Sequence, residues 1–144
     1  MDDHPPKILF LCRRNSCRSQ MAEGWCRALY PEKFQPFSAG IEQGPMDQRA
    51  VTVMSEAGID ISKQVSKSTE AIKSQEFDYV ISVCDITASD CPIFAGSGKR
   101  IAQPFDDPPK LAESENAEED KLSHYRRVRD EIRVYIERLP ELLC

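Results

Sequence analysis

Short apolar runs alternate with helix-like segments along the chain, and this alternation restricts the fold more than any other feature. Four runs are typical of buried strands: 7–12, 34–38, 78–84 and the weaker 99–103. Three segments have apolar residues at helical spacing: 19–30, 48–57 and a last one that ends at Pro140. Asn116 followed by Glu119 predicts a capped start for the last helix, and Gly58 predicts a C-cap for the second. The order predicts an α/β fold, with an open parallel four-stranded sheet and helices on both faces.

Length and charge limit the function. The 144 residues suffice for a single domain, 1–144, and no apolar run approaches the roughly 20 residues that span a bilayer. The N-terminal sequence MDDHPPK does not resemble a secretory signal, so we expect a cytoplasmic protein whose six cysteines are thiols. A net charge of −5 argues against a nucleic-acid partner and requires any anion site to be local.

The first apolar run ends in Cys12, and a loop with three arginines leads from it into the first helix. Ligands of parallel sheets bind beyond the carboxyl ends of strands, and a helix N-terminus there offers free amides to an anion. Arginines and amides also favour a nucleophilic thiolate, to which Ser19 can donate its hydroxyl. Arg18 can present a planar two-pronged donor to an oxyanion. We therefore expect an oxyanion cradle whose substrate-binding residues are Arg13, Arg14, Asn15, Ser16, Cys17, Arg18 and Ser19. A buried strand cysteine and a surface arginine would explain either residue alone, but not their spacing.

Six segments of the chain are informative as a set: CRRNSCRSQMAEGW, SAGIE, GIDIS, VCDITASDCP, FDDPP and YRRVRDEI. In order and spacing they resemble those of the arsenate reductases built on the low-molecular-weight tyrosine phosphatase fold. The resemblance implies that Cys12 attacks arsenic in arsenate and that Asp107, with Asp106 as the alternative, protonates the leaving oxygen. It also implies that Cys84 and Cys91 complete a disulfide relay without a cofactor. Thioredoxin would reduce the relay, with glutaredoxin or glutathione as the alternative reductant.

Geometry sets a condition on this relay. Cys84 ends a strand, as Cys12 does, so the two thiols can meet at the same edge of the sheet. A disulfide requires Cα atoms within roughly 7 Å, and seven extended residues would span about 24 Å. Segment 85–90 must therefore loop back to bring Cys91 to Cys84, and we expect it to rearrange between redox states.

Two positions depart from the family pattern. Arg14 replaces a loop glycine that many relatives have; with Arg13 it could strengthen the attraction of an anion or alter which reductant docks. Lys67 replaces an aspartate with which several relatives bind potassium, beside residues that match Asn15, Glu23 and Ser38. Because an ammonium would compete with a cation for this place, we expect no metal site and no potassium requirement.

Two other functions use the same residues. A phosphatase for phosphotyrosine or a small phosphoester would need only Cys12, Arg18 and Asp107. Family phosphatases commonly have proline where Gln20 stands and an aromatic residue where Pro109 stands, which counts against this reading. A thiol-based protein could instead bind arsenite or a soft metal through Cys12, Cys84 and Cys91, although it would need neither Arg18 nor Asp107.

Overall fold

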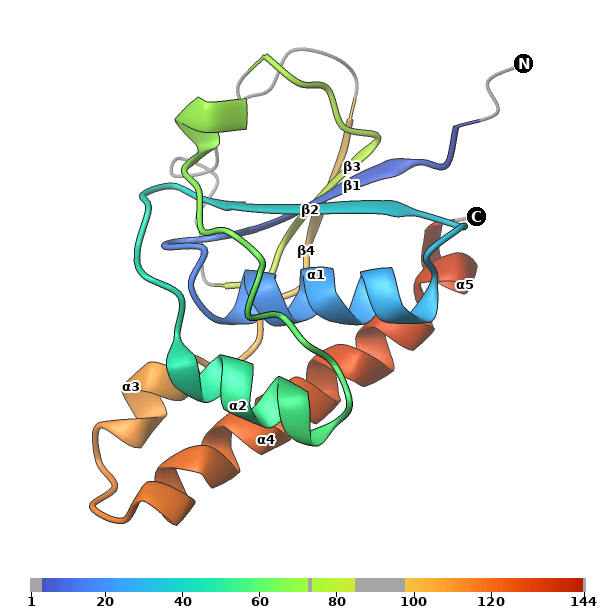
Figure 1. Ribbon diagram of the computed structural model, residues 1–144. Helices are drawn as coiled ribbons and strands as arrows, with labels where there is room; N and C mark the ends of the chain where they lie inside the picture. The colour runs from blue at the N-terminus through green and yellow to red at the C-terminus, as the bar shows by residue number, and fades with distance from the viewer. Residues whose placement is uncertain (1–3, 73, 85–97, 144) are drawn as a thin grey trace.

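The computed structural model describes residues 4–72, 74–84 and 98–143, and its described strands form one parallel sheet (Figure 1). The strands are β1 (Lys7–Cys12), β2 (Gln35–Gly40), β3 (Tyr79–Ser82) and β4 (Lys99–Ala102). They lie in the order β2-β1-β3-β4, and every neighbouring pair is parallel. The predicted open four-stranded sheet is confirmed. The central strand β1 is apolar along its length because Ile8 to Leu11 are fully buried between two layers.

The helices divide unequally between the faces of the sheet. In chain order they are α1 (Arg18–Leu29), α2 (Gln48–Glu56), the 3-10 helix η1 (Thr69–Ile72), α3 (Pro108–Ala112), α4 (Glu118–Glu137) and α5 (Leu139–Leu143). Figure 1 shows α1, α2 and α4 together on one side of the sheet, where they enclose the larger core, including Phe10, Trp25 and Ile132. Within the described residues, η1 lies on the other face, over a smaller cluster that includes Leu11 and Ile72.

Helix ends agree only in part with the sequence expectations. Gly58 has the left-handed φ of +85° that suits a C-cap, and the amide of Ile59 reaches back to Met54 O over 2.9 Å. The predicted cap at Asn116 is wrong, because α4 begins at Glu118 after Ala117 and has no side-chain cap. Three acidic residues in its first turn favour the positive end of the helix dipole instead.

Pro140 does not end the helical region as predicted. It is the second residue of α5, a position where its missing N–H is not needed for a helical hydrogen bond. Helix α3 was not predicted, because its start Pro108-Pro109 is typical of a turn; here the prolines occupy its first positions.

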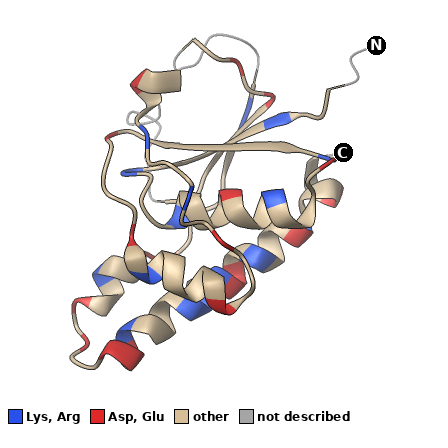
Figure 2. Ribbon diagram, in the orientation of Figure 1, with Lys and Arg blue, Asp and Glu red and all other residues tan. Residues whose placement is uncertain are grey.

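Charged side chains fix α4 to α2. Figure 2 shows basic and acidic residues alternating along α4. Arg126 pairs with Glu56 and Glu119, while Arg129 also contacts Glu56 and donates to the Val53 carbonyl over 2.8 Å. Exposed pairs of this kind each contribute at most about 1 kcal/mol, so the network orients the helices rather than holding the fold together. Within the described ranges, no helix has the length and apolar character needed to cross a bilayer.

Candidate active site

The topology brings the ends of β1 and β3 together. These strands are neighbours, while the chain leaves β1 for β2 on the opposite side, so the order reverses between them. Such a switch point is where open α/β sheets form ligand crevices. Cys12 ends β1, and Cys84 follows β3 by two residues. Both thiols lie in the wall of one open pocket of about 680 Å³, at the carboxyl edge of the sheet.

The loop after Cys12 has its carbonyl groups turned outward. Each carbonyl oxygen accepts a hydrogen bond from outside the loop. The donors and acceptors are Glu42 N to Arg13 O (2.9 Å), Gly44 N to Arg14 O (3.0 Å), Gln20 Nε2 to Asn15 O (2.9 Å) and Asp47 N to Ser16 O (3.0 Å). In a planar trans peptide the N–H points opposite to the C=O, so the amides of residues 14–17 face the inside of the loop. The amide of Asn15 shows this, since it donates to Cys12 Sγ over 3.3 Å. The loop is therefore an amide-lined cradle.

Asn15 gives the loop its sharp bend. Its φ of 53° makes it the one non-glycine residue with positive φ in the described chain, and asparagine tolerates this region better than most residues. Its side chain donates to Ser19 Oγ over 2.8 Å and accepts from the backbone amide of Lys67 over 2.9 Å. Arg14 is not in the left-handed region, so this position of the loop does not require glycine.

A glycine is required beside the loop rather than in it. A Cβ at Gly40 would lie 2.6 Å from both the Arg14 carbonyl carbon and the Asn15 nitrogen. Gly40 ends β2 and pairs with Cys12 across the sheet. The missing side chain of Gly40 thus allows the loop after Cys12 to pack directly on β2.

Ser19 can donate a hydrogen bond to the nucleophile. Its hydroxyl lies 2.9 Å from Cys12 Sγ, and both groups are buried. The Asn15 side chain already donates to Ser19 Oγ, so the hydroxyl hydrogen is left for the sulfur. Together with the Asn15 amide, this gives a thiolate at Cys12 two hydrogen-bond donors.

Arg18 begins α1 and lines the same pocket as Cys12. Its side chain is only 12% exposed; the guanidinium donates through Nη1 to Phe105 O over 2.9 Å and has Nη2 3.7 Å from Asp107 Oδ2. Arg18 lines the pocket together with Arg13, Arg14, Ser16 and Cys17 of the loop. Arg13 and Arg14 are exposed at the rim, where Arg14 lies 3.7 Å from Glu42.

The two candidate acids point in different directions. Asp107 lines the pocket beside Arg18 and is the residue before the first turn of α3. Asp106 turns away and accepts from Arg127 of α4 over 3.0 Å. Only Asp107 therefore lies where it could give a proton to a group bound in the cradle.

The cysteines of the described residues are all free thiols with different surroundings. Burial raises the pKa of the Cys84 thiol to about 11, and a negative charge on Cys12 acts in the same direction, whereas Arg18 and the Arg13 amide act against it. Burial also raises the pKa of Cys17 well above its usual range, with Asp47 contributing, so this pocket thiol stays protonated. Cys26 packs in the core. Cys91 and segment 85–90 lie outside the described residues.

A polar cluster of Glu23, Ser38 and Lys67 lies behind the cradle. Glu23 is almost fully buried, accepts from the Ser38 hydroxyl, and pairs with Arg27 over 2.7 Å. Lys67 donates through Nζ to Val65 O over 3.0 Å, and burial lowers the pKa of its ammonium while Glu23 opposes this. In the described part of the chain, no three His, Cys, Asp or Glu side chains come together as metal ligands would.

Part of the site had no sequence signal. The segment from Glu42 to Asp47 supplies three of the amides that hold the loop carbonyls outward, and Met46 and Asp47 line the pocket. Asp47 also caps α2 through the Arg49 amide and accepts from the buried Tyr125 hydroxyl over 2.7 Å. Only the three-dimensional packing of α2 and α4 reveals these connections.

Comparisons with known proteins agree with this geometry. Residues 7–143 match the model of the family described as low molecular weight phosphotyrosine protein phosphatase. The chain is 44% identical over 134 residues to an arsenate reductase of Bacillus licheniformis, covering 93% of this chain and 94% of the relative. A solved arsenate reductase in a phosphate-binding state superimposes with a TM-score of 0.71 at 31% identity, covering 96% and 99% of the two chains. A tyrosine phosphatase from Erwinia amylovora superimposes with a TM-score of 0.76 at 20% identity, covering 96% and 93%, which shows the fold alone.

Proposed function

The chain belongs to the low molecular weight phosphotyrosine protein phosphatase family, and we propose that it acts within that family as an arsenate reductase. One observation of the structure supports this proposal independently of the relatives' names. Two thiols, Cys12 and Cys84, line the same pocket as Arg18. A phosphatase needs only the first thiol. Reduction of arsenate needs two electrons, which two thiols supply when they become a disulfide.

The first step forms a covalent bond to arsenic. Arsenate lies in the loop amides with Arg18 on its oxygens, and the Cys12 thiolate attacks the arsenic atom. An S–As bond forms while one oxygen leaves as water, and Asp107 supplies a proton to that oxygen. The Ser19 hydroxyl and the Asn15 amide both face the sulfur that attacks, at 2.9 and 3.3 Å.

The second step transfers the electrons. Cys84, as thiolate, attacks the Cys12 sulfur; an S–S bond forms, and the electron pair of the S–As bond goes to arsenic. Arsenic is reduced from the +5 to the +3 state and leaves as arsenite. The negative charge of Cys12, which opposes ionisation of Cys84 in the resting protein, is absent from the adduct, so Cys84 ionises more readily when it is needed.

The remaining steps restore Cys12. Cys91 attacks Cys84, which releases the Cys12 thiolate and leaves a Cys84–Cys91 disulfide for an external dithiol to reduce. We propose thioredoxin as this reductant, because the spacing of the two cysteines resembles the thioredoxin-coupled members of the family; glutaredoxin with glutathione is the alternative. A relay that must be reduced in each cycle suits the reducing cytoplasm, where we place the protein.

A single-turnover experiment tests the chemistry without any reductant. Reduced wild-type protein mixed with excess arsenate should release one arsenite and lose two thiols per chain. In a Cys91→Ser variant the disulfide should be found between Cys12 and Cys84 by peptide mapping. Arsenite release without loss of thiols, or thiol loss with no arsenite, would contradict the mechanism.

The main alternative is a phosphatase that uses Cys12, Arg18 and Asp107, and it makes a different prediction. Hydrolysis of para-nitrophenyl phosphate would then require Cys12 and proceed unchanged in Cys84→Ser. Weak hydrolysis alongside arsenate reduction is compatible with the proposal, because phosphate has the shape of arsenate. Tight arsenite binding through three thiols, without turnover, would instead indicate the soft-metal alternative.

A further inference from the structure

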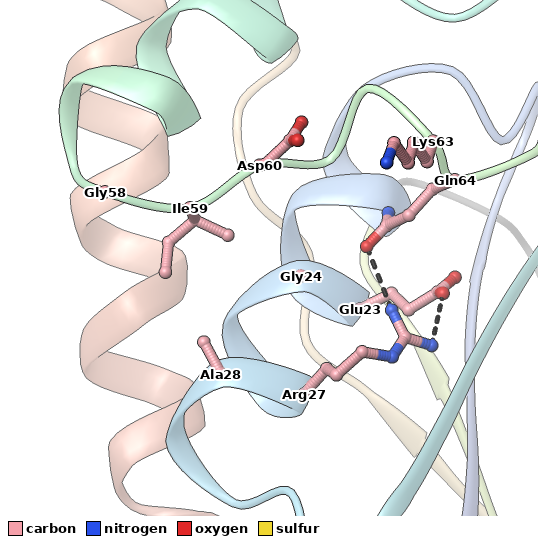
Figure 3. Close-up of a pocket in the computed structure, with 9 residues that line it drawn as sticks. All are labelled: Glu23, Gly24, Arg27, Ala28, Gly58, Ile59, Asp60, Lys63 and Gln64. Atoms are coloured by element: carbon pink, nitrogen blue, oxygen red, sulfur yellow. Dashed lines mark hydrogen bonds and ion pairs between the residues drawn. The ribbon is translucent and has the colours of Figure 1, made fainter.

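A directed chain of hydrogen bonds connects the surface to the back of the cradle. Arg27 donates through Nη1 to Gln64 Oε1 over 3.0 Å, and Gln64 Nε2 donates to Gln20 Oε1 over 2.8 Å. Gln20 Nε2 in turn donates to Asn15 O over 2.9 Å and to Val65 O over 3.2 Å. Figure 3 shows the outer end of this chain, where Gln64 and Arg27 face each other in a second pocket.

The chemistry of the end groups fixes the direction of the chain. A guanidinium can only donate and a backbone carbonyl can only accept, so each of the two amides between them has one orientation that satisfies both neighbours. In that orientation every link has a donor facing an acceptor. Gln20 is completely buried in α1, which excludes water as a substitute partner for its amide.

The contact with Asn15 O acts on the cradle itself. The carbonyl of Asn15 and the amide of Ser16 belong to one planar peptide, so holding the carbonyl outward turns the Ser16 N–H toward the anion. Asn15 is also the one non-glycine residue with positive φ in the described chain, so this peptide lies at the sharpest bend of the loop. The other loop carbonyls accept from backbone amides, whereas this one depends on a side chain.

We propose that Gln20 and Gln64 are positioning residues that hold the Asn15–Ser16 peptide in its anion-binding orientation. Gln20 acts on the peptide directly, and Gln64 acts by fixing the Gln20 amide. The inference rests on the proposed function for the identity of the cradle, but its test needs no arsenate and no turnover. Inorganic phosphate serves as the oxyanion probe.

The experiment measures how phosphate protects Cys12 from alkylation by iodoacetamide, over a range of phosphate concentrations. Gln20→Met keeps the length of the side chain and removes its amide; Gln20→Glu keeps the acceptor for Gln64 and removes both donors. Either change should raise the half-protecting phosphate concentration about fivefold to tenfold, the effect of one lost hydrogen bond. Gln64→Met should raise it about twofold to threefold, because Gln20 keeps its own donors.

A matched control is available at the opposite end of the sheet. Gln35 in β2 also donates from Nε2 to a backbone carbonyl, that of Pro5, over 3.1 Å, and Gln35→Met should leave protection unchanged. Thermal unfolding of each variant separates a general loss of stability from a loss of anion affinity. Should the buried Gln20 variants fail to fold, the half-buried Gln64→Met variant carries the test.

The outcomes distinguish this inference from the proposed function. If Gln20→Met, Gln20→Glu and Gln64→Met all keep the phosphate protection seen in the wild type, the positioning role is overturned and the arsenate proposal is left intact. Absence of phosphate protection in the wild type would contradict both. Weakened protection in the Gln20 and Gln64 variants, with Gln35→Met like wild type, would support the inference even if arsenate reduction were never observed.

Discussion

Asp107→Asn tests the proposed proton donor, and Asp106 next to it provides a matched control. Both residues precede α3, and asparagine keeps the size of either side chain while removing its acidic proton. Asp107 lines the pocket with its Oδ2 3.7 Å from Arg18 Nη2, whereas Asp106 accepts from Arg127 on the outer surface. The two substitutions therefore remove the same chemical group from inside and outside the site.

The expected magnitudes differ by at least an order of magnitude. General acid catalysis contributes roughly 100- to 10,000-fold, so Asp107→Asn should lower kcat/KM for arsenate by at least about 100-fold. The Asp106 pair with Arg127 is exposed, with 64% and 43% of the two side chains accessible, and such pairs contribute at most about 1 kcal/mol. Asp106→Asn should lower kcat/KM by less than about fivefold.

The assay is arsenate reduction coupled to thioredoxin and NADPH, with arsenate varied below and above KM. Among the described residues, the hydrogen bonds to the Cys12 sulfur come from Ser19 and Asn15 and not from Asp107. Both variants should therefore be alkylated at Cys12 as the wild type is, which checks that the cradle is intact. Equal losses in the two variants would refute the assignment. A larger loss of kcat/KM in Asp106→Asn than in Asp107→Asn would assign the proton donor to Asp106, whose side chain would then have to rotate into the pocket.

Two further predictions concern pH and ions. Because burial raises the pKa of Cys84 and attack requires the thiolate, formation of the Cys12–Cys84 disulfide should accelerate as the pH rises above about 7, by at most about tenfold per unit. Rapid-quench measurements on Cys91→Ser that show no rise would contradict the role of Cys84. Since the Lys67 ammonium lies beside Glu23 behind the cradle, activity in potassium at about 100 mM should equal that in sodium, and a clear excess in potassium would show that the cation site is still used.

The sequence predicted the parts of the fold that depend on local chemistry. The apolar run to Cys12 is a strand buried on both faces, and a glycine suits the left-handed end of α2 at Gly58. Helix α1 begins at Arg18, one residue before the predicted start, because periodicity locates apolar residues better than ends. The unequal covering of the two faces depends on long-range packing, which periodicity does not contain.

The candidate site was predictable where one segment supplies several groups. Cys12, Arg18 and Ser19 are close in sequence, and a strand, loop and helix necessarily place them around one point. The choice between Asp106 and Asp107 could not be made from local pattern, since it depends on where Arg127 of α4 lies. Gln20 appeared only as a departure from the phosphatase pattern, and its bond to Asn15 O became visible only in the folded chain.

The central claim, a thiol relay that reduces arsenate, is tested most directly by arsenate-dependent oxidation of NADPH through thioredoxin reductase and thioredoxin. Wild type should turn over, and Cys12→Ser, Cys84→Ser and Cys91→Ser should each lose turnover, while the core variant Cys26→Ser retains it. Absence of turnover in wild type, together with para-nitrophenyl phosphate hydrolysis that needs Cys12 but neither Cys84 nor Cys91, would contradict the account and indicate a phosphatase.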